Sequence, residues 1–243
     1  LRAVMAKAVE YRGMARAAAV AAIERWPQPV QFADIIGGGR EMRQALRAAE
    51  AASKGGEPVL IAGETGTGKT LLARAIHTQG STRRCPLVTA YGTGSEEWEL
   101  VLELFGDDTA ANRGLPPEPG LVELGRHGTL LLHDFAPDDK PWVQERVATA
   151  FATGQALRWG GNTPCPVSSR VIIEQTVQLT PDACMGFAVP WREYVERFDG
   201  GRCIVLPPLR RRREDIPLLL DRFVAEAAMR TGKRAPGLSP EAM

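Results

Sequence analysis

Hydrophobic residues follow two patterns that alternate along the chain, one with helical spacing and one of short continuous apolar runs. Helical spacing occurs in residues 41–52, 70–77 and 215–229. The runs, which are apolar or β-branched, occupy residues 57–62, 86–90, 129–132, 171–174 and 203–206. Runs of this length are typical of strands buried on both faces. The alternation predicts an α/β fold with a parallel sheet between layers of helices.

The two ends of the chain carry further helical patterns. Residues 1–26 form an imperfect heptad pattern that stops before Pro27 and Pro29. This segment is expected to be a helix that either packs on its own domain or pairs with a second copy. It starts in mid-pattern without a Met or a cap, so we expect the chain to be a fragment. Residues 215–229 place an apolar stripe on one helix face, made of Ile216, Leu219, Leu220, Phe223 and Ala227.

Residues 107–120 contain glycines and three prolines without periodicity, and they are expected to form a long exposed loop.

Composition and charge exclude several classes of protein. The 243 residues are 44% hydrophobic and 24% charged, which is typical of a globular fold and not of a disordered chain. No apolar run approaches the roughly 18–20 residues of a membrane span, and no signal peptide is evident, so we expect a cytoplasmic protein without membrane association. With 30 basic and 29 acidic residues, the chain lacks a basic field that could recruit nucleic acid. The four cysteines have no metal or redox spacing and are expected to be buried apolar residues.

One motif carries specific chemistry. The sequence of a P-loop lies where a predicted strand meets a predicted helix; its residues are Gly63, Glu64, Thr65, Gly66, Thr67, Gly68, Lys69 and Thr70. Glycines let backbone amides surround phosphates, Lys69 supplies a positive charge, and the Thr70 hydroxyl can hold Mg²⁺. The partial positive charge of the helix N-terminus adds to this field. The motif predicts binding of a nucleotide such as ATP or ADP with Mg²⁺.

Other segments resemble the central AAA+ domain of the NtrC-like bacterial enhancer-binding proteins, which activate sigma-54 RNA polymerase. The resemblance runs from about residue 32 to residue 229. It is carried by residues 32–37, by the P-loop with residues 72–77, and by residues 103–106, 128–130, 206–210 and 213–218.

The resemblance implies a P-loop ATPase fold that assembles into a dimer through the linker helix or into a hexameric ring. It divides the chain into a linker helix (1–31), an AAA+ core (32–206) and the start of a C-terminal helical lid (207–243). It also implies nucleotide contact by Ile36, RNA polymerase as a partner, and promoter DNA bound through a helix-turn-helix domain outside this chain.

Residues that hydrolyse ATP in this family are altered here. The family has Asp-Glu at the end of the strand that follows Gly128, where the Asp helps to hold Mg²⁺ and the Glu polarises the attacking water. Those places hold His133 and Asp134. In this register Asp134 is the candidate catalytic and Mg²⁺ carboxylate; with a slip of one residue, Asp134 takes the magnesium place and Phe135 the catalytic one. The pair is incomplete in either case. A phosphate contact by a protonated His133 is a further alternative.

Other family elements are also changed. The GAFTGA loop that contacts the sigma factor is replaced by residues 110–115, and Thr176 occupies the place of the Asn that senses the γ-phosphate. Arg192 matches the first arginine finger, the group that reaches into a neighbouring subunit's nucleotide, although an ordinary salt-bridge arginine is the alternative. The second finger's position falls on Phe198.

Two further histidines and a run of arginines are not expected to form functional sites of their own. His77 and His127 lack partners at metal-ligand spacing and are expected to be ordinary histidines. The run of four arginines at residues 210–213 is interpreted as a solvated loop and subunit contact rather than a nucleic-acid site.

The sequence therefore predicts a nucleotide-binding AAA+ module of a transcriptional regulator, with weak or absent hydrolysis and no remodelling of sigma-54 polymerase. One alternative is an active ATPase that remodels the polymerase as a sigma-54-type activator. Another is a P-loop protein unrelated to transcription.

Overall fold

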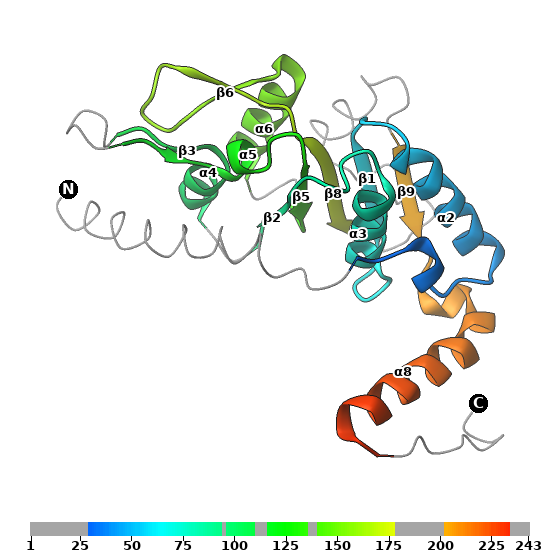
Figure 1. The fold of residues 1–243 in the computed structure, drawn as a ribbon. Helices are drawn as coiled ribbons and strands as arrows, with labels where there is room; N and C mark the ends of the chain where they lie inside the picture. The colour runs from blue at the N-terminus through cyan, green and yellow to red at the C-terminus, as the bar shows by residue number, and fades with distance from the viewer. Residues whose placement is uncertain (1–28, 94–95, 110–115, 136–139, 178–201, 234–243) are drawn as a thin grey trace.

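A computed structural model describes residues 29–93, 96–109, 116–135, 140–177 and 202–233 (Figure 1). The predicted N-terminal helix, residues 110–115 and Arg192 lie outside these ranges.

The centre of the molecule is a five-stranded sheet in the order β2-β5-β8-β1-β9, and every neighbouring pair is parallel. The strands are β1 (Val59–Gly63), β2 (Leu87–Tyr91), β5 (Thr129–His133), β8 (Arg170–Thr176) and β9 (Arg202–Leu206). Each overlaps one of the five predicted apolar runs, and the parallel sheet between helices confirms the predicted α/β class. Because all five strands run the same way, their carboxyl ends meet at one edge of the sheet.

Helices cover both faces of the sheet (Figure 1). One face is covered by α2 (Arg40–Ser53) and α3 (Lys69–Gln79), and the other by α4 (Glu97–Phe105), α5 (Leu121–Leu124) and α6 (Pro141–Thr153). Alternate strand residues enter separate cores: Ile172 packs on the side of α2 and α3, whereas Val171 and Ile173 pack with α4–α6. The two-residue period of a strand thus decides which helices each side chain meets.

A buried arginine ties the start of β8 to the end of α2. The Arg170 side chain donates to the carbonyl oxygen of Ala52 at 2.7 Å and to that of Glu57 at 3.1 Å. The last carbonyls of a helix lack i+4 partners, and the guanidinium adds a charged donor to the Ala52 carbonyl, which also accepts the Gly55 N–H at 3.3 Å.

Two short ribbons depart from the sequence prediction. Residues 107–120 were expected to be an exposed loop, but β3 (Gly106–Asp107) pairs with β4 (Glu118–Pro119), and Asp107 is buried. A second ribbon joins β6 (Gln155–Leu157) to β7 (Pro164–Pro166) and was not predicted. Strands of two or three residues that contain Gly or Pro give no periodic signal.

The C-terminal part begins with two short 3-10 helices, η4 (Leu209–Arg211) and η5 (Arg213–Asp215), and continues as α8 (Ile216–Thr231). The predicted helix is present and extends away from the sheet (Figure 1). Its apolar stripe is not buried by the described part of the chain, because no residue of α8 is buried and Phe223 is 59% exposed.

The expected burial of the cysteines is confirmed in part. Among the described cysteines Cys165 is buried, Cys85 is partly buried and Cys203 is exposed, so burial was correctly predicted only for the first. No helix in the described ranges is long and apolar enough to cross a membrane.

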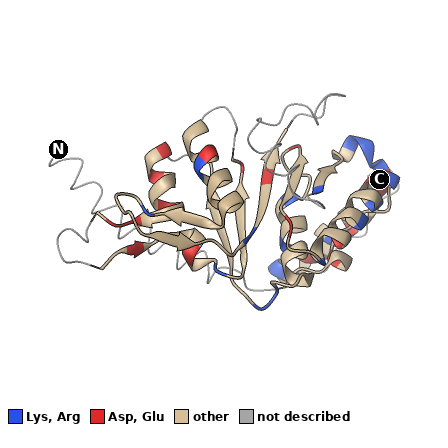
Figure 2. Cartoon of the chain, turned by 90° about the horizontal axis from the view of Figure 1, so that it is seen from above, with Lys and Arg blue, Asp and Glu red and all other residues tan. Residues whose placement is uncertain are grey.

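Charged residues lie on both halves of the molecule, with Lys and Arg gathered mainly on the side of α2 and α8 (Figure 2).

The half-buried Glu103 of α4 makes the stability of the fold depend on pH. Burial raises the pKa of Glu103 to about 7. Ionisation therefore costs the folded state stability as pH rises from the ordinary glutamate pKa through about 7. We expect Glu103→Gln to be about 1–3 kcal/mol more stable than wild type at pH 8, with a smaller gain at pH 5, in urea unfolding. The exposed Glu145→Gln on α6 is the control, and an equal gain at both pH values would contradict the assignment.

Candidate nucleotide-binding site

The P-loop joins β1 to α3 and takes its shape from glycine. Gly66 and Gly68 have φ angles of +80° and +102°, a region that side chains with a Cβ rarely adopt. Space is not the reason, since a Cβ at either position would meet nothing within 4 Å. Thr67 closes the turn by donating its hydroxyl to the carbonyl oxygen of Glu64 at 2.8 Å.

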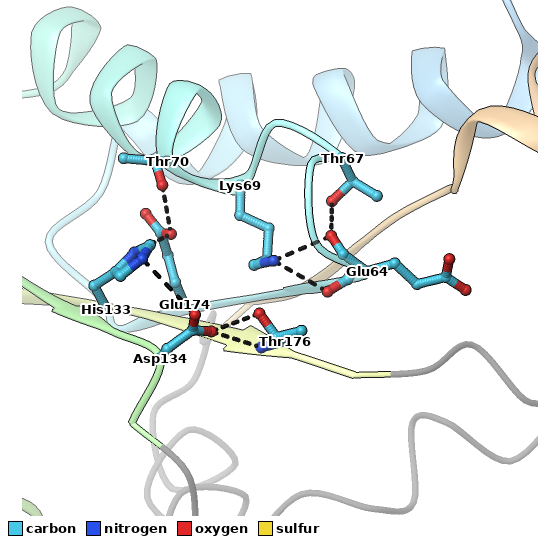
Figure 3. A network of polar contacts seen from close by, with 9 residues as sticks. Glu64, Thr67, Lys69, Thr70, His133, Asp134, Glu174 and Thr176 are labelled. Atoms are coloured by element: carbon cyan, nitrogen blue, oxygen red, sulfur yellow. Dashed lines mark hydrogen bonds and ion pairs between the residues drawn. The ribbon is translucent and has the colours of Figure 1, made fainter. Parts of the chain in front are cut away.

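The positive groups of the loop converge at the start of α3. Lys69 Nζ donates to the carbonyl oxygens of Gly63 at 3.2 Å and Glu64 at 3.1 Å, which holds the ammonium group across the loop (Figure 3). No side chain caps α3, whose N-cap residue is Gly68. Its first N–H groups lack partners within the helix, and such a helix end is an anion-binding site.

A carboxylate that the sequence analysis missed lies beside Thr70. Glu174 is fully buried at the end of β8, and its Oε2 atom accepts the Thr70 hydroxyl at 2.8 Å and lies 2.8 Å from His133 Nδ1 (Figure 3). His133 and Glu174 are paired in register between β5 and β8. Glu174 was treated only as part of a strand. A signal was available in its charge at the end of an otherwise apolar run.

The electrostatics of this carboxylate combine opposing effects. Burial raises the pKa of Glu174, while the hydrogen bond from Thr70 and the contacts with His133 and Lys69 oppose the rise. The Oε1 atom is buried and has no hydrogen-bond partner among the described residues. A carboxylate in this position gains stability from a cation placed next to it.

Asp134 makes different contacts from those expected of it. Its Oδ1 atom accepts the Thr176 hydroxyl at 2.6 Å and the Thr176 backbone N–H at 3.1 Å (Figure 3). The residue has a left-handed φ of +48°, which is uncommon outside glycine. The Thr70 hydroxyl donates to Glu174 and not to Asp134. Asp134 instead joins the end of β5 to the end of β8. Its predicted roles in metal binding and catalysis stay predictions.

Two of the four arginines at residues 210–213, Arg210 and Arg212, contact the P-loop. Arg210 forms a bidentate ion pair with Glu64, and both N···O distances are 2.6 Å. Arg212 is only 6% exposed and donates to the carbonyl oxygen of Thr67 at 3.1 Å. A solvated loop was expected, and Arg212 departs from it because it is buried against the nucleotide loop.

The segment before α2 is held by the same C-terminal part. Asp215 is fully buried, and its Oδ1 atom accepts the backbone N–H of Gly38 at 2.6 Å. Ile36, two residues before Gly38, is half-buried; its predicted nucleotide contact stays a prediction. Thr65 lies exposed on the P-loop.

His77 is buried, and its Nδ1 atom is hydrogen-bonded to the Thr129 hydroxyl at 2.8 Å, as expected of an ordinary histidine.

The parallel sheet, the glycine loop at the end of β1, and a lysine and threonine at the start of α3 define a P-loop NTPase domain. The family model of the sigma-54 interaction domain matches residues 35–185. The chain belongs to this family, the AAA+ domain of sigma-54-dependent transcriptional regulators, as its resemblance to the NtrC-like proteins implied.

Named relatives agree with this assignment. The chain is 35% identical over 211 residues to the DNA-binding transcriptional regulator NtrC of Klebsiella pneumoniae, covering 86% of this chain and 44% of that protein. It is 34% identical to the transcriptional regulatory protein ZraR of Salmonella typhimurium, covering 86% of this chain and 47% of that protein. The chain thus spans less than half the length of these relatives.

Solved structures show the same fold. A crystal structure of NtrX from Brucella abortus in complex with ATP superposes with a TM-score of 0.70 at 26% identity, covering 85% of this chain and 44% of that one. The ADP complex of the same protein gives a TM-score of 0.71 at 27% identity, covering 86% of this chain and 45% of that one.

The loop glycines yield a stability test. At φ of +102°, Gly68→Ala is strained although space is open, so we expect a loss of about 1–2 kcal/mol in denaturant unfolding. Gly56→Ala is the matched control, because Gly56 also has open space but no left-handed φ. Equal effects of the two substitutions would contradict a conformational requirement at Gly68.

Proposed function

We propose that this chain is the nucleotide-binding AAA+ module of a bacterial DNA-binding transcriptional regulator in which ATP or ADP controls assembly and hydrolysis is slow. Nucleotide binding is supported by the P-loop and by the ATP and ADP complexes of a structural relative. The N-terminus of α3 and Lys69 would hold the phosphates, and Thr70 would serve the Mg²⁺ ion that accompanies them.

The observation that carries slow hydrolysis is the double hydrogen bond from Thr176 to Asp134. A carboxylate that polarises the attacking water has to reach the oxygen of that water. The Asp134 carboxylate is instead bonded to Thr176 at the end of β8. Its side chain is also one methylene shorter than glutamate. A misplacement of about 1 Å can cost roughly a hundredfold in rate.

The partners in this proposal follow from sequence positions. Residues 110–115 replace the GAFTGA loop, so the proposal includes contact with RNA polymerase in another form than sigma-54 remodelling. Promoter DNA would be bound by a helix-turn-helix domain outside this chain. Assembly would be a homo-oligomer, a dimer or a ring, in which Arg192 approaches the neighbouring nucleotide.

Steady-state phosphate release tests the hydrolysis proposal. We expect the purified chain to release phosphate from ATP at the level of Lys69→Ala, which loses the loop cation, over a range of protein concentrations. Turnover well above that blank and rising with concentration would sink the proposal. It would instead support the active, polymerase-remodelling ATPase with a site completed between subunits.

A restored site tests the cause of slow hydrolysis. His133→Asp would place two carboxylates in contact unless Glu174 is also replaced, since His133 Nδ1 lies 2.8 Å from Glu174. We therefore expect the triple variant His133→Asp, Asp134→Glu, Glu174→Ala to release phosphate about tenfold or more faster than wild type. The double variant that retains Asp134 is the control. Equal rates for the double and triple variants would show that Asp134 does not limit turnover.

A further inference from the structure

We propose that Glu174 is the carboxylate that completes the magnesium site at Thr70, supplied from β8 instead of from the end of β5, with His133 as its positioning residue. The inference rests on the proposed nucleotide binding and names an acidic group in place of the one absent at position 133.

The first support is the direction of the hydrogen bond at Thr70. Its hydroxyl donates to Glu174 Oε2 at 2.8 Å. A hydroxyl has one proton and two acceptor lone pairs, so giving the proton to Glu174 leaves the oxygen free to face a cation. A P-loop threonine and a nearby acidic residue together hold the Mg²⁺ that bridges nucleotide phosphates.

The second support is an unsatisfied oxygen. Glu174 is 0% exposed, and its Oε1 atom has no partner among the described residues. A buried ionised oxygen without a partner costs stability, so it needs an explanation. Mg²⁺ is a hard cation that takes oxygen ligands and keeps several waters, and one or two carboxylates with substrate phosphates suffice to bind it. The donor set present at Thr70 therefore fits Mg²⁺.

The third support is the placement of His133 and Glu174 on adjacent strands. His133 and Glu174 are in register across β5 and β8 and share the sheet face covered by α3. Neighbouring strands lie about 4.8 Å apart. Glutamate is one methylene longer than aspartate, and here its carboxylate reaches both Thr70 and His133. The carboxylate missing from β5 is therefore replaced from the adjacent strand.

His133 acts on the site through Glu174. Its Nδ1 atom lies 2.8 Å from Glu174 Oε2, and the imidazole packs edge-on against Tyr91 with ring centroids 5.2 Å apart. A neutral histidine protonated on Nδ1 can donate this hydrogen bond, which fixes one carboxylate oxygen and leaves Oε1 for the site. When bound, Mg²⁺ would neutralise charge on the nucleotide phosphates.

The test is the magnesium dependence of binding of a fluorescent, non-hydrolysable ATP analogue, measured with Mg²⁺ and with EDTA. For wild type we expect Mg²⁺ to tighten binding by about tenfold or more, and for Glu174→Gln we expect most of this enhancement to be lost while EDTA binding persists. Glu174→Gln is isosteric and keeps an acceptor for Thr70. The exposed Glu145→Gln is the control and should behave as wild type.

Two further variants test whether Glu174 or Asp134 supplies the carboxylate of the magnesium site. The double variant His133→Asp, Glu174→Ala returns the carboxylate to β5, and we expect it to regain the Mg²⁺ enhancement; thermal unfolding checks that each variant folds. A wild-type enhancement that persists in Glu174→Gln, or is lost only in Asp134→Asn, would overturn the inference. So would wild-type binding that is equally tight with and without Mg²⁺. Absence of analogue binding under both conditions would instead overturn the proposed function, and the inference with it.

Discussion

The hydrogen-bonded register of β8 between β5 and β1 is the constraint on which the rest of this structure depends. It sets His133 opposite Glu174 on one side and Ile61 opposite Glu174 on the other. Because a strand alternates its side chains, the same register sends the carboxylate toward α3 and the side chains of Val171 and Ile173 toward α4–α6. A shift by one residue would bury Glu174 among apolar side chains and remove the acceptor of the Thr70 hydroxyl. Arg170 holds the opposite end of the strand in place through its bonds to the end of α2.

Under the proposed function, the changes at His133 and Asp134 have unequal consequences. Holding a metal ion requires charge and oxygen atoms at a place, and these can come from any strand that ends there. Activating a water requires a carboxylate with the correct reach toward one oxygen, and here Asp134 is bonded to Thr176 instead. Under the proposed function, nucleotide binding and slow turnover can therefore coexist at one loop.

The sequence predicts the parts of this molecule that have strong periodicity or a fixed motif. The five apolar runs became the five strands, and the glycine loop lies between β1 and α3. Contacts between distant residues were beyond it: Thr70 and Glu174 are separated by 104 positions, and only the strand order brings them together. The short ribbons at β3–β4 and β6–β7 were missed because so few residues carry no pattern. The burial of Arg212 was missed because a run of arginines is usually solvated.

The pairing of Arg210 with Glu64 and the bond from Arg212 to Thr67 attach the C-terminal segment directly to the nucleotide loop. Beyond that attachment, the 16 residues of α8 form a straight arm of about 24 Å. A rotation of about 10° at its base displaces the far end by about 4 Å, given a rise of roughly 1.5 Å per residue. Any rotation of the C-terminal segment against the P-loop would therefore be largest at the far end of α8, and it would carry with it an apolar stripe that the described residues do not cover.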